Sequence, residues 1–102
     1  MLELRPNCEH CNIDLSPDAT TAMICSFECT FCRNCVEKHL SNVCPNCGGG
    51  FTLRPIRPSR NWNNQNDLHH HPAIESRTHK PVNLEYHRKF SAPIVKIKPQ
   101  DR

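Results

Sequence analysis

The chain has 102 residues, a formal net charge of +3 at pH 7 and eight cysteines, all of them in its first half. No stretch approaches the roughly 18 to 20 apolar residues of a membrane helix, and the N-terminus has no basic segment followed by an apolar run, so we expect neither a membrane span nor a signal peptide. Only the first ~55 residues have a composition that can fold, and so short a segment needs a metal or disulfides to offset chain entropy. In a reducing cytoplasm, which is the expected location, close cysteine pairs indicate metal ligands.

The chain begins with the pattern of short strands joined by turns. Leu2 and Leu4 alternate with charged residues, which predicts a short half-buried strand. Residues 12–21 have a loop composition, and the apolar run 22–24 predicts a buried strand. The residues that follow are expected to return the chain as the second arm of a hairpin.

The next residues predict the core. In so small a domain Phe27 and Phe31 are interpreted as packing residues, because every large side chain is needed inside. Val36 and Leu40 are four residues apart and therefore share one face of a short helix, which is predicted to begin at Cys35.

The foldable part is predicted to end with a turn and a strand. Residues 41–42 end the helix, and the glycines 48–50 allow positive φ angles and a close approach of backbone N–H groups to sulfur. Phe51 and Leu53 alternate with polar residues and predict a final short strand. We therefore expect one small metal-stabilised α+β domain over residues 1–57, with a short β-hairpin and one short helix.

The cysteines form four close pairs, which are Cys8/Cys11, Cys25/Cys29, Cys32/Cys35 and Cys44/Cys47. Each pair can aim two sulfurs at one ion, so eight cysteines can bind two Zn²⁺ in tetrahedral sites, and zinc is favoured over iron or a disulfide framework. Joining the second pair to the third is sterically tight. Joining neighbours in order and crossing the pairs are both feasible, and crossing has the advantage of tying both ends of the fold together. The crossed assignment places Cys8, Cys11, Cys32 and Cys35 in site 1 and Cys25, Cys29, Cys44 and Cys47 in site 2.

Two histidines lie near these ligands in the sequence. His10 falls inside the first pair, and His39 falls on a face of the predicted helix away from its apolar residues. Because the cysteines already complete two four-ligand sites, neither histidine is expected to bind the metal.

The cysteine spacing resembles that of a known family. The order C-x2-C, x13, C-x3-C, x2, C-x2-C, x8, C-x2-C resembles the RING-finger pattern, with Cys29 where most RING domains have histidine. The run from Ala22 to Cys32 and the Cys-Pro-Asn-Cys-Gly-Gly ending are more similar still to a small bacterial cysteine-rich family, domain of unknown function 1272. This resemblance covers the first half of the chain. It implies a RING-like cross-brace zinc finger without an assigned activity.

The remaining residues, 58–102, are expected to be a basic and largely disordered tail, since they contain few apolar side chains and cannot bury a core. Of the charged residues after position 54, nine are basic and four are acidic, whereas residues 1–54 carry four basic and six acidic residues. The triplet His69–His71 is able to bind a transition metal weakly, although the sequence alone implies no fixed geometry.

Two short elements are predicted within this tail. Val82, Tyr86 and Phe90 follow each other at intervals of four residues, which indicates a short helix that is too isolated to be stable by itself. Residues 94–97 are apolar enough to add as an edge strand to the finger or to a partner.

Three functions are compatible with these features. The preferred one is a non-catalytic zinc-finger adaptor that binds an unidentified protein partner, because no catalytic set of residues is present and all metal positions are filled by cysteine. An enzyme is an alternative. It would be a ubiquitin-type ligase, although His10 and Gly48 depart from the residues usual next to the ligands of such domains, or a thiol redox protein, although two four-cysteine sites leave no free pair. Binding of nucleic acid through the basic tail is a further alternative. It is disfavoured because the arginines are dispersed along the tail and do not form one basic cluster.

Overall fold

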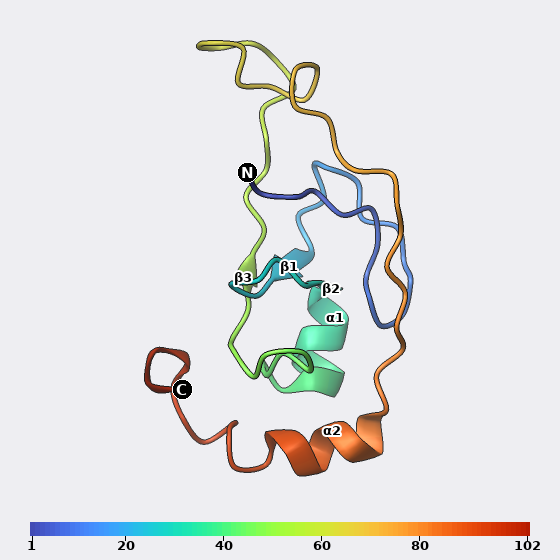
Figure 1. Cartoon of the computed structure of the whole chain (residues 1–102), viewed down its shortest axis with the longest axis vertical. Helices are drawn as coiled ribbons and strands as arrows, with labels where there is room; N and C mark the ends of the chain where they lie inside the picture. Colours follow the sequence, from blue (N-terminus) through green and yellow to red (C-terminus); the bar gives the residue numbers. More distant parts are fainter.

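A three-stranded antiparallel sheet lies at the centre of the N-terminal half in the computed structural model, which describes residues 1–102 (Figure 1). Its strands are β1 (Ala22–Ile24), β2 (Thr30–Cys32) and β3 (Thr52–Leu53), and β1 lies between the other two. The predicted hairpin and the predicted last strand are therefore present, although each strand is only two or three residues long.

The N-terminal segment has no strand, so the prediction of one around Leu2 and Leu4 was wrong. Leu4 is nevertheless buried, and the following loop is closed by an isolated bridge between Asn7 and Asp14. The alternation of apolar and charged residues correctly indicated a half-buried segment. The strand does not form because no neighbouring segment offers this stretch a ladder of backbone partners.

One continuous helical segment follows β2. It consists of α1 (Arg33–Cys35) and a π-helical turn η1 (Val36–Leu40), and both Val36 and Leu40 are buried as predicted. The helix begins two residues earlier than the sequence suggested. It ends at Ser41, which adopts a left-handed conformation with φ of 52° and donates its backbone N–H to the carbonyl of Val36.

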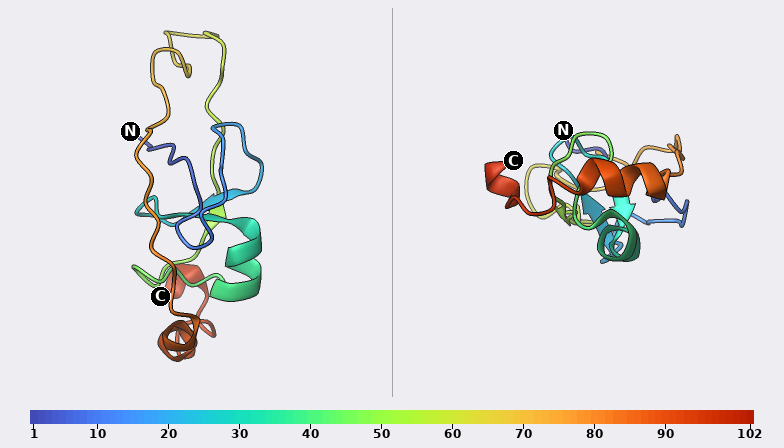
Figure 2. Two further views of the ribbon diagram at one scale, coloured as in Figure 1. Left: turned by 90° about the vertical axis from the view of Figure 1, so that its right-hand side faces the viewer. Right: turned by 90° about the horizontal axis from the view of Figure 1, so that it is seen from below.

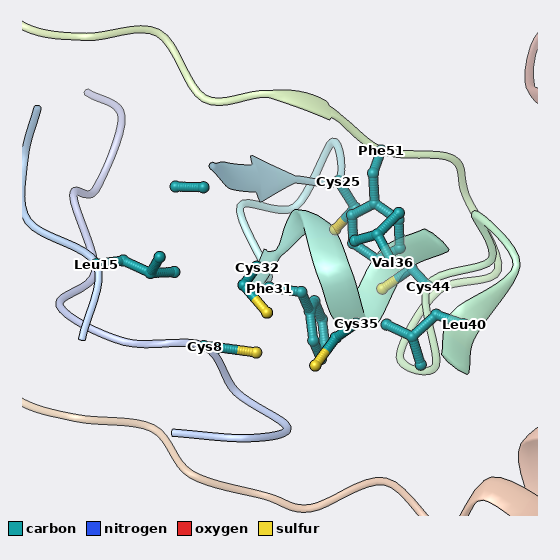
Figure 3. Packing of buried hydrophobic residues seen from close by; sticks show 11 residues of the cluster. Cys8, Leu15, Cys25, Phe31, Cys32, Cys35, Val36, Leu40, Cys44 and Phe51 are labelled. Atoms are coloured by element: carbon teal, nitrogen blue, oxygen red, sulfur yellow. The ribbon is translucent and has the colours of Figure 1, made fainter. Parts of the chain in front are cut away.

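The core is small and consists largely of cysteine, aliphatic and phenylalanine side chains (Figure 3). Phe31 is fully buried and packs edge-on against Phe51, with 5.4 Å between the ring centres. Phe27, by contrast, is 71% exposed, so its assignment to the core was wrong. The turn that carries it is held by a hydrogen bond from the Phe27 backbone N–H to the Cys25 sulfur, and this turn directs the side chain outward.

We call the cysteine-rich part of the chain, residues 1–57, the finger. The segment after β3 leaves the finger as a long loop and returns to it, as Figure 1 shows at the top of the molecule. Arg57 closes the base of this loop, because its guanidinium donates to the carbonyls of His71 at 2.7 Å and Leu2 at 2.8 Å. The backbone N–H of Leu68 also bonds the carbonyl of Pro58 within the loop.

The rest of the tail runs back along the finger to a helix at the opposite end, α2 (Leu84–Ser91), and finishes in the 3₁₀ turn η2 (Pro99–Asp101). Two perpendicular views (Figure 2) show the same arrangement, with α2 at the far end from the projecting loop. The prediction of a largely disordered tail is not confirmed. That prediction considered only the tail's own apolar residues, whereas the tail binds the finger largely through polar groups, such as the ring of buried His87, which lies 2.9 Å from the carbonyl of Val43.

The two elements predicted in the tail had different outcomes. The helix is present, but its buried residues are His87 and Ser91, while Tyr86 is 69% exposed. Residues 94–97 do not form an edge strand and instead make turns, in which the backbone N–H of Val95 bonds the carbonyl of Ser91. None of the helices combines the length and the apolar composition that crossing a membrane requires.

Candidate metal centres

Four sulfurs from two distant parts of the sequence meet beside the core. The Sγ atoms of Cys8, Cys11, Cys32 and Cys35 all lie within 4.8 Å of one another. The Cys11 and Cys32 sulfurs are 3.8 Å apart, and a tetrahedral zinc ion with Zn–S bonds near 2.3 Å holds its sulfurs about 3.8 Å apart. This first centre therefore fits Zn²⁺, and Figure 3 shows three of its sulfurs directed toward one another.

Short backbone hydrogen bonds shape the loop that carries the first two of these cysteines. The backbone N–H of Cys8 bonds the carbonyl of Ile13 at 3.0 Å, and the N–H of Asn12 bonds the carbonyl of Cys8 at 2.9 Å. Asn12 has φ of 65°, which an asparagine tolerates better than most residues. Cys32 and Cys35 come from the end of β2 and the end of α1, so the centre joins the N-terminal loop to the sheet and the helix.

A second group of sulfurs belongs to Cys25, Cys44 and Cys47, whose Sγ atoms also lie within 4.8 Å of one another. Cys29, the predicted fourth ligand, is outside this group. Its sulfur instead accepts a hydrogen bond of 3.4 Å from the side-chain amide of Asn46. Its backbone stays close to the group, because the N–H of Cys25 bonds the carbonyl of Cys29 at 3.2 Å.

Backbone N–H groups point at each sulfur of the second group. The N–H groups of Phe27, Asn46 and Gly49 lie 3.4 Å from the sulfurs of Cys25, Cys44 and Cys47. Gly48, with φ of 80°, makes the turn that the last of these contacts needs. Such N–H groups stabilise thiolates and orient them toward a metal, so three prepared ligands are present.

The sulfurs of the first centre differ in their affinity for protons. Burial opposes ionisation of Cys8, but hydrogen bonds from the backbone N–H groups of Cys11, Cys32 and His10 outweigh it and lower the pKa of this thiol. Burial raises the pKa of Cys32 and, much more strongly, that of Cys35. Cys32 and Cys35 therefore keep their protons until a cation displaces them.

The same effect operates at the second group. Burial is the largest influence on both Cys29 and Cys44 and raises the pKa of each, and the neighbouring Cys25 adds to it. A divalent cation reverses this balance, since it binds only the thiolate form.

The grouping of the sulfurs follows the crossed order of the cysteine pairs. The first pair lies with the third, and Cys25 of the second pair lies with the fourth. Binding of metal by these groups stays a prediction. Neither His10 nor His39 belongs to either group; the Nδ1 atom of His10 accepts a hydrogen bond from the backbone N–H of Val82 at 2.9 Å.

Two polar residues, Glu9 and Asn46, connect the two centres and were not identified from the sequence. Glu9, inside the first pair, is almost fully buried, and its carboxylate accepts a 3.1 Å hydrogen bond from the Asn46 amide and lies 3.4 Å from the Lys80 ammonium. A polar residue between two ligands usually faces solvent. The burial of Glu9 could therefore not be predicted without knowing that Lys80 of the tail lies against it.

Two comparisons with known proteins bear on this chain. The model of the family described as "Protein of unknown function (DUF1272)" matches residues 1–57. The chain belongs to this DUF1272 family. An uncharacterized protein of Rhizobium meliloti (strain 1021) is 52% identical over 81 residues, which are 79% of this DUF1272 chain and 89% of that protein. Because this alignment is longer than the family match, the similarity extends into the tail. No solved structure matches the chain.

Proposed function

We propose that this DUF1272 chain is a structural zinc module with two interlocked all-cysteine centres in a RING-like cross-brace, and that it binds another protein without catalysing a reaction itself. The observation that carries the proposal is the convergence of four sulfurs at the distances that a tetrahedral zinc ion requires. Structural zinc sites of this type contribute directly to folding, which a domain with so small a core needs.

The absence of catalysis follows from how the ligands fill the sites. A centre with four cysteine ligands leaves no position for water or substrate. At the second group we assign the fourth position to Cys29, because its backbone adjoins Cys25 and its sulfur is restrained by one 3.4 Å hydrogen bond from Asn46. A metal–thiolate bond is stronger than this contact, so Cys29 turns onto the ion when zinc binds.

We place the partner contact at the exposed turn between β1 and β2. Phe27 is 71% exposed there and borders a concavity of about 410 Å³ that is also lined by Gly48, Gly49, Ile94 and Ile97. The turn is held by the hydrogen bond from the Phe27 backbone N–H to the Cys25 sulfur, which belongs to the second group. A rigid exposed aromatic residue beside an apolar depression is typical of a residue that anchors a protein interface.

Native mass spectrometry of the reduced full-length chain, with elemental analysis of the same sample, tests the metal centres. We expect two zinc ions per chain, and we expect Cys32→Ser to lose one of them together with its folded NMR spectrum. A chain that contains iron, or a Cys32→Ser variant that keeps both zinc ions and a native spectrum, would contradict the proposal.

A photo-crosslinking amino acid at position 27, incorporated while the chain is made in a bacterium such as Rhizobium meliloti, which contains a related protein, tests the partner contact. We expect one discrete adduct at this position. Trp62 is a matched control, since it is an equally exposed aromatic residue on the distant loop, and the same crosslinker there is expected to give no such adduct. The absence of an adduct at position 27, or equal adducts at both positions, rejects the adaptor role and leaves the zinc centres unaffected.

A further inference from the structure

The projecting loop contains a buried carboxylate that the metal centres do not use. Asp67 is 2% exposed, although it lies in a loop whose neighbouring residues are mostly exposed. Its Oδ1 accepts hydrogen bonds of 2.9 Å from the backbone N–H and from the ring Nδ1 of His70, and its Oδ2 lies 3.1 Å from the same Nδ1. These bonds lower the pKa of Asp67, so the group is a carboxylate at neutral pH.

This contact fixes the orientation of the His70 ring and which of its two nitrogens carries the hydrogen. A carboxylate accepts a proton in a hydrogen bond, so Nδ1 of His70 carries the hydrogen and Nε2 is left with a free lone pair. The side chain of His70 is 37% exposed, and hence its outer edge is accessible from solvent. Histidines that bind metals are usually held in this way, with one nitrogen donating to a carboxylate and the other facing the ion.

A second imidazole lies at the appropriate distance. The rings of His69 and His70 are perpendicular, and their centres are 5.1 Å apart. Two imidazoles bound to one tetrahedral ion, with metal–nitrogen bonds of about 2.0 to 2.1 Å, have their ring centres about 5 Å apart. The pair is therefore spaced as two ligands of a single ion would be.

We propose that His69 and His70 form a third metal site, which binds a divalent transition-metal ion such as Zn²⁺ through two imidazole nitrogens, with Asp67 as its positioning residue. This site is separate from the cysteine centres, because its loop contains none of the eight cysteines and projects beyond the sheet at the end opposite to α2 (Figures 1 and 2). Water completes the coordination, so the site binds zinc more weakly than four thiolates do and exchanges it more readily.

The test uses the full-length chain with both cysteine centres already loaded with zinc. Further Zn²⁺ is titrated by calorimetry, and the histidine ring nitrogens are followed by long-range ¹H–¹⁵N NMR. We expect one additional equivalent to bind, with the Nε2 resonance of His70 and one ring-nitrogen resonance of His69 shifting together. Before this addition, the His70 spectrum should already show the form with the proton on Nδ1.

Three variants separate the proposed ligands from the rest of the loop. His70→Ala and His69→Ala each remove a ligand and should abolish or strongly weaken the additional binding. Asp67→Asn should weaken it by about tenfold or more while native mass spectrometry still shows two bound zinc ions. His71→Ala is the matched control, and it should leave the binding unchanged.

The outcomes that overturn the proposal are equally specific. Unchanged additional binding in the His69→Ala/His70→Ala double variant would assign the extra zinc to other residues. A His70 ring with its proton on Nε2, or no extra equivalent bound by the wild-type chain, would show that the two rings only pack against each other.

Discussion

Cys29 is the residue that distinguishes the two centres from each other. Its sulfur is bound to the Asn46 amide, whereas the other seven sulfurs lie in groups that leave room for a single ion each. Because the same amide also bonds the Glu9 carboxylate, Asn46 is a direct connection between the second group and the first pair. We expect this connection to loosen when Cys29 joins the metal.

Substitution of single cysteines should reveal this difference. Cys44→Ser removes a fully buried ligand of the second group and should weaken binding of the second zinc ion more than Cys29→Ser does, because one of its three remaining sulfurs, that of Cys29, must first leave the Asn46 amide. Cys29→Ser should keep two zinc ions at a lower affinity, with three sulfurs and a water as ligands. Competition with a chromophoric chelator measures both effects, and equal losses in the two variants would contradict the special position of Cys29.

The raised thiol pKa values predict how zinc affinity depends on pH. Zinc binds thiolates, but burial keeps Cys32 and Cys35 protonated at neutral pH, so each must release its proton when zinc binds. Apparent zinc affinity should therefore increase steadily from about pH 6 to about pH 8 and weaken on acidification. Calorimetry in buffers of different ionisation enthalpy counts the released protons, and binding that releases none would show that the sulfurs are already thiolates.

Individual residues show what the sequence could and could not predict about the site. The cysteine spacing suffices to identify the eight candidate ligands and to favour the crossed grouping. It could not distinguish Phe27 from Phe31, since both are large apolar residues close to ligands, and only the direction of the hairpin turn leaves the first exposed and buries the second. The contact between Asp67 and His70 could not be predicted either, because it depends on the conformation of the loop, which the composition of the loop does not determine.

Among the elements, the helical segment α1–η1 was the best predicted. Its two apolar residues, Val36 and Leu40, are four residues apart and both lie in the core. The face of α2 could not be predicted in the same way. A hydrogen bond between His87 and the Val43 carbonyl decides which side of this helix turns inward, and an apolar repeat contains no information about such a polar contact.

A pair of leucine substitutions tests the importance of the helical segment. Leu40 is fully buried in the core, so Leu40→Ala should lower the free energy of unfolding of the zinc-loaded chain by about 2 to 5 kcal/mol. Leu53→Ala changes the same atoms on a residue that is 48% exposed, and it should cost less than about 1 kcal/mol. Denaturant unfolding at a fixed free zinc concentration measures both, and similar losses would show that η1 is not part of the core.

At the scale of the whole molecule, the tail runs along the finger from the projecting loop to α2 and binds it at several places (Figure 1). The stretch from Arg77 to Lys80 runs along the first cysteine pair, where the backbone N–H of Lys80 bonds the carbonyl of Glu9 at 2.9 Å. At the C-terminus the Arg102 guanidinium donates to the carbonyls of Asn42 and Gly48. These contacts use main-chain groups of the finger, which explains why the tail's low apolar content did not prevent them.

Removal of the tail tests how much the finger depends on it. A fragment of residues 1–57 contains all eight cysteines and should still bind two zinc ions and fold. It should release zinc to a chelator faster than the full chain, because the contacts to Glu9, Val43 and Gly48 are lost. Full-length His87→Ala removes only the contact to Val43, so its rate of zinc release should lie between those of the full chain and the fragment. A fragment that unfolds would show that finger and tail form one cooperative unit.

The position of Trp62 has a practical consequence for spectroscopy. It is the only tryptophan of the chain, it is 76% exposed, and it lies on the projecting loop far from α2. Its emission should therefore resemble that of a solvated indole whether or not the cysteine centres are loaded, so tryptophan fluorescence will miss the unfolding of the finger. The same indole lies on the loop of His69 and His70, where a paramagnetic ion such as Ni²⁺ should quench it, so the emission of the chain's one tryptophan would report on that end alone.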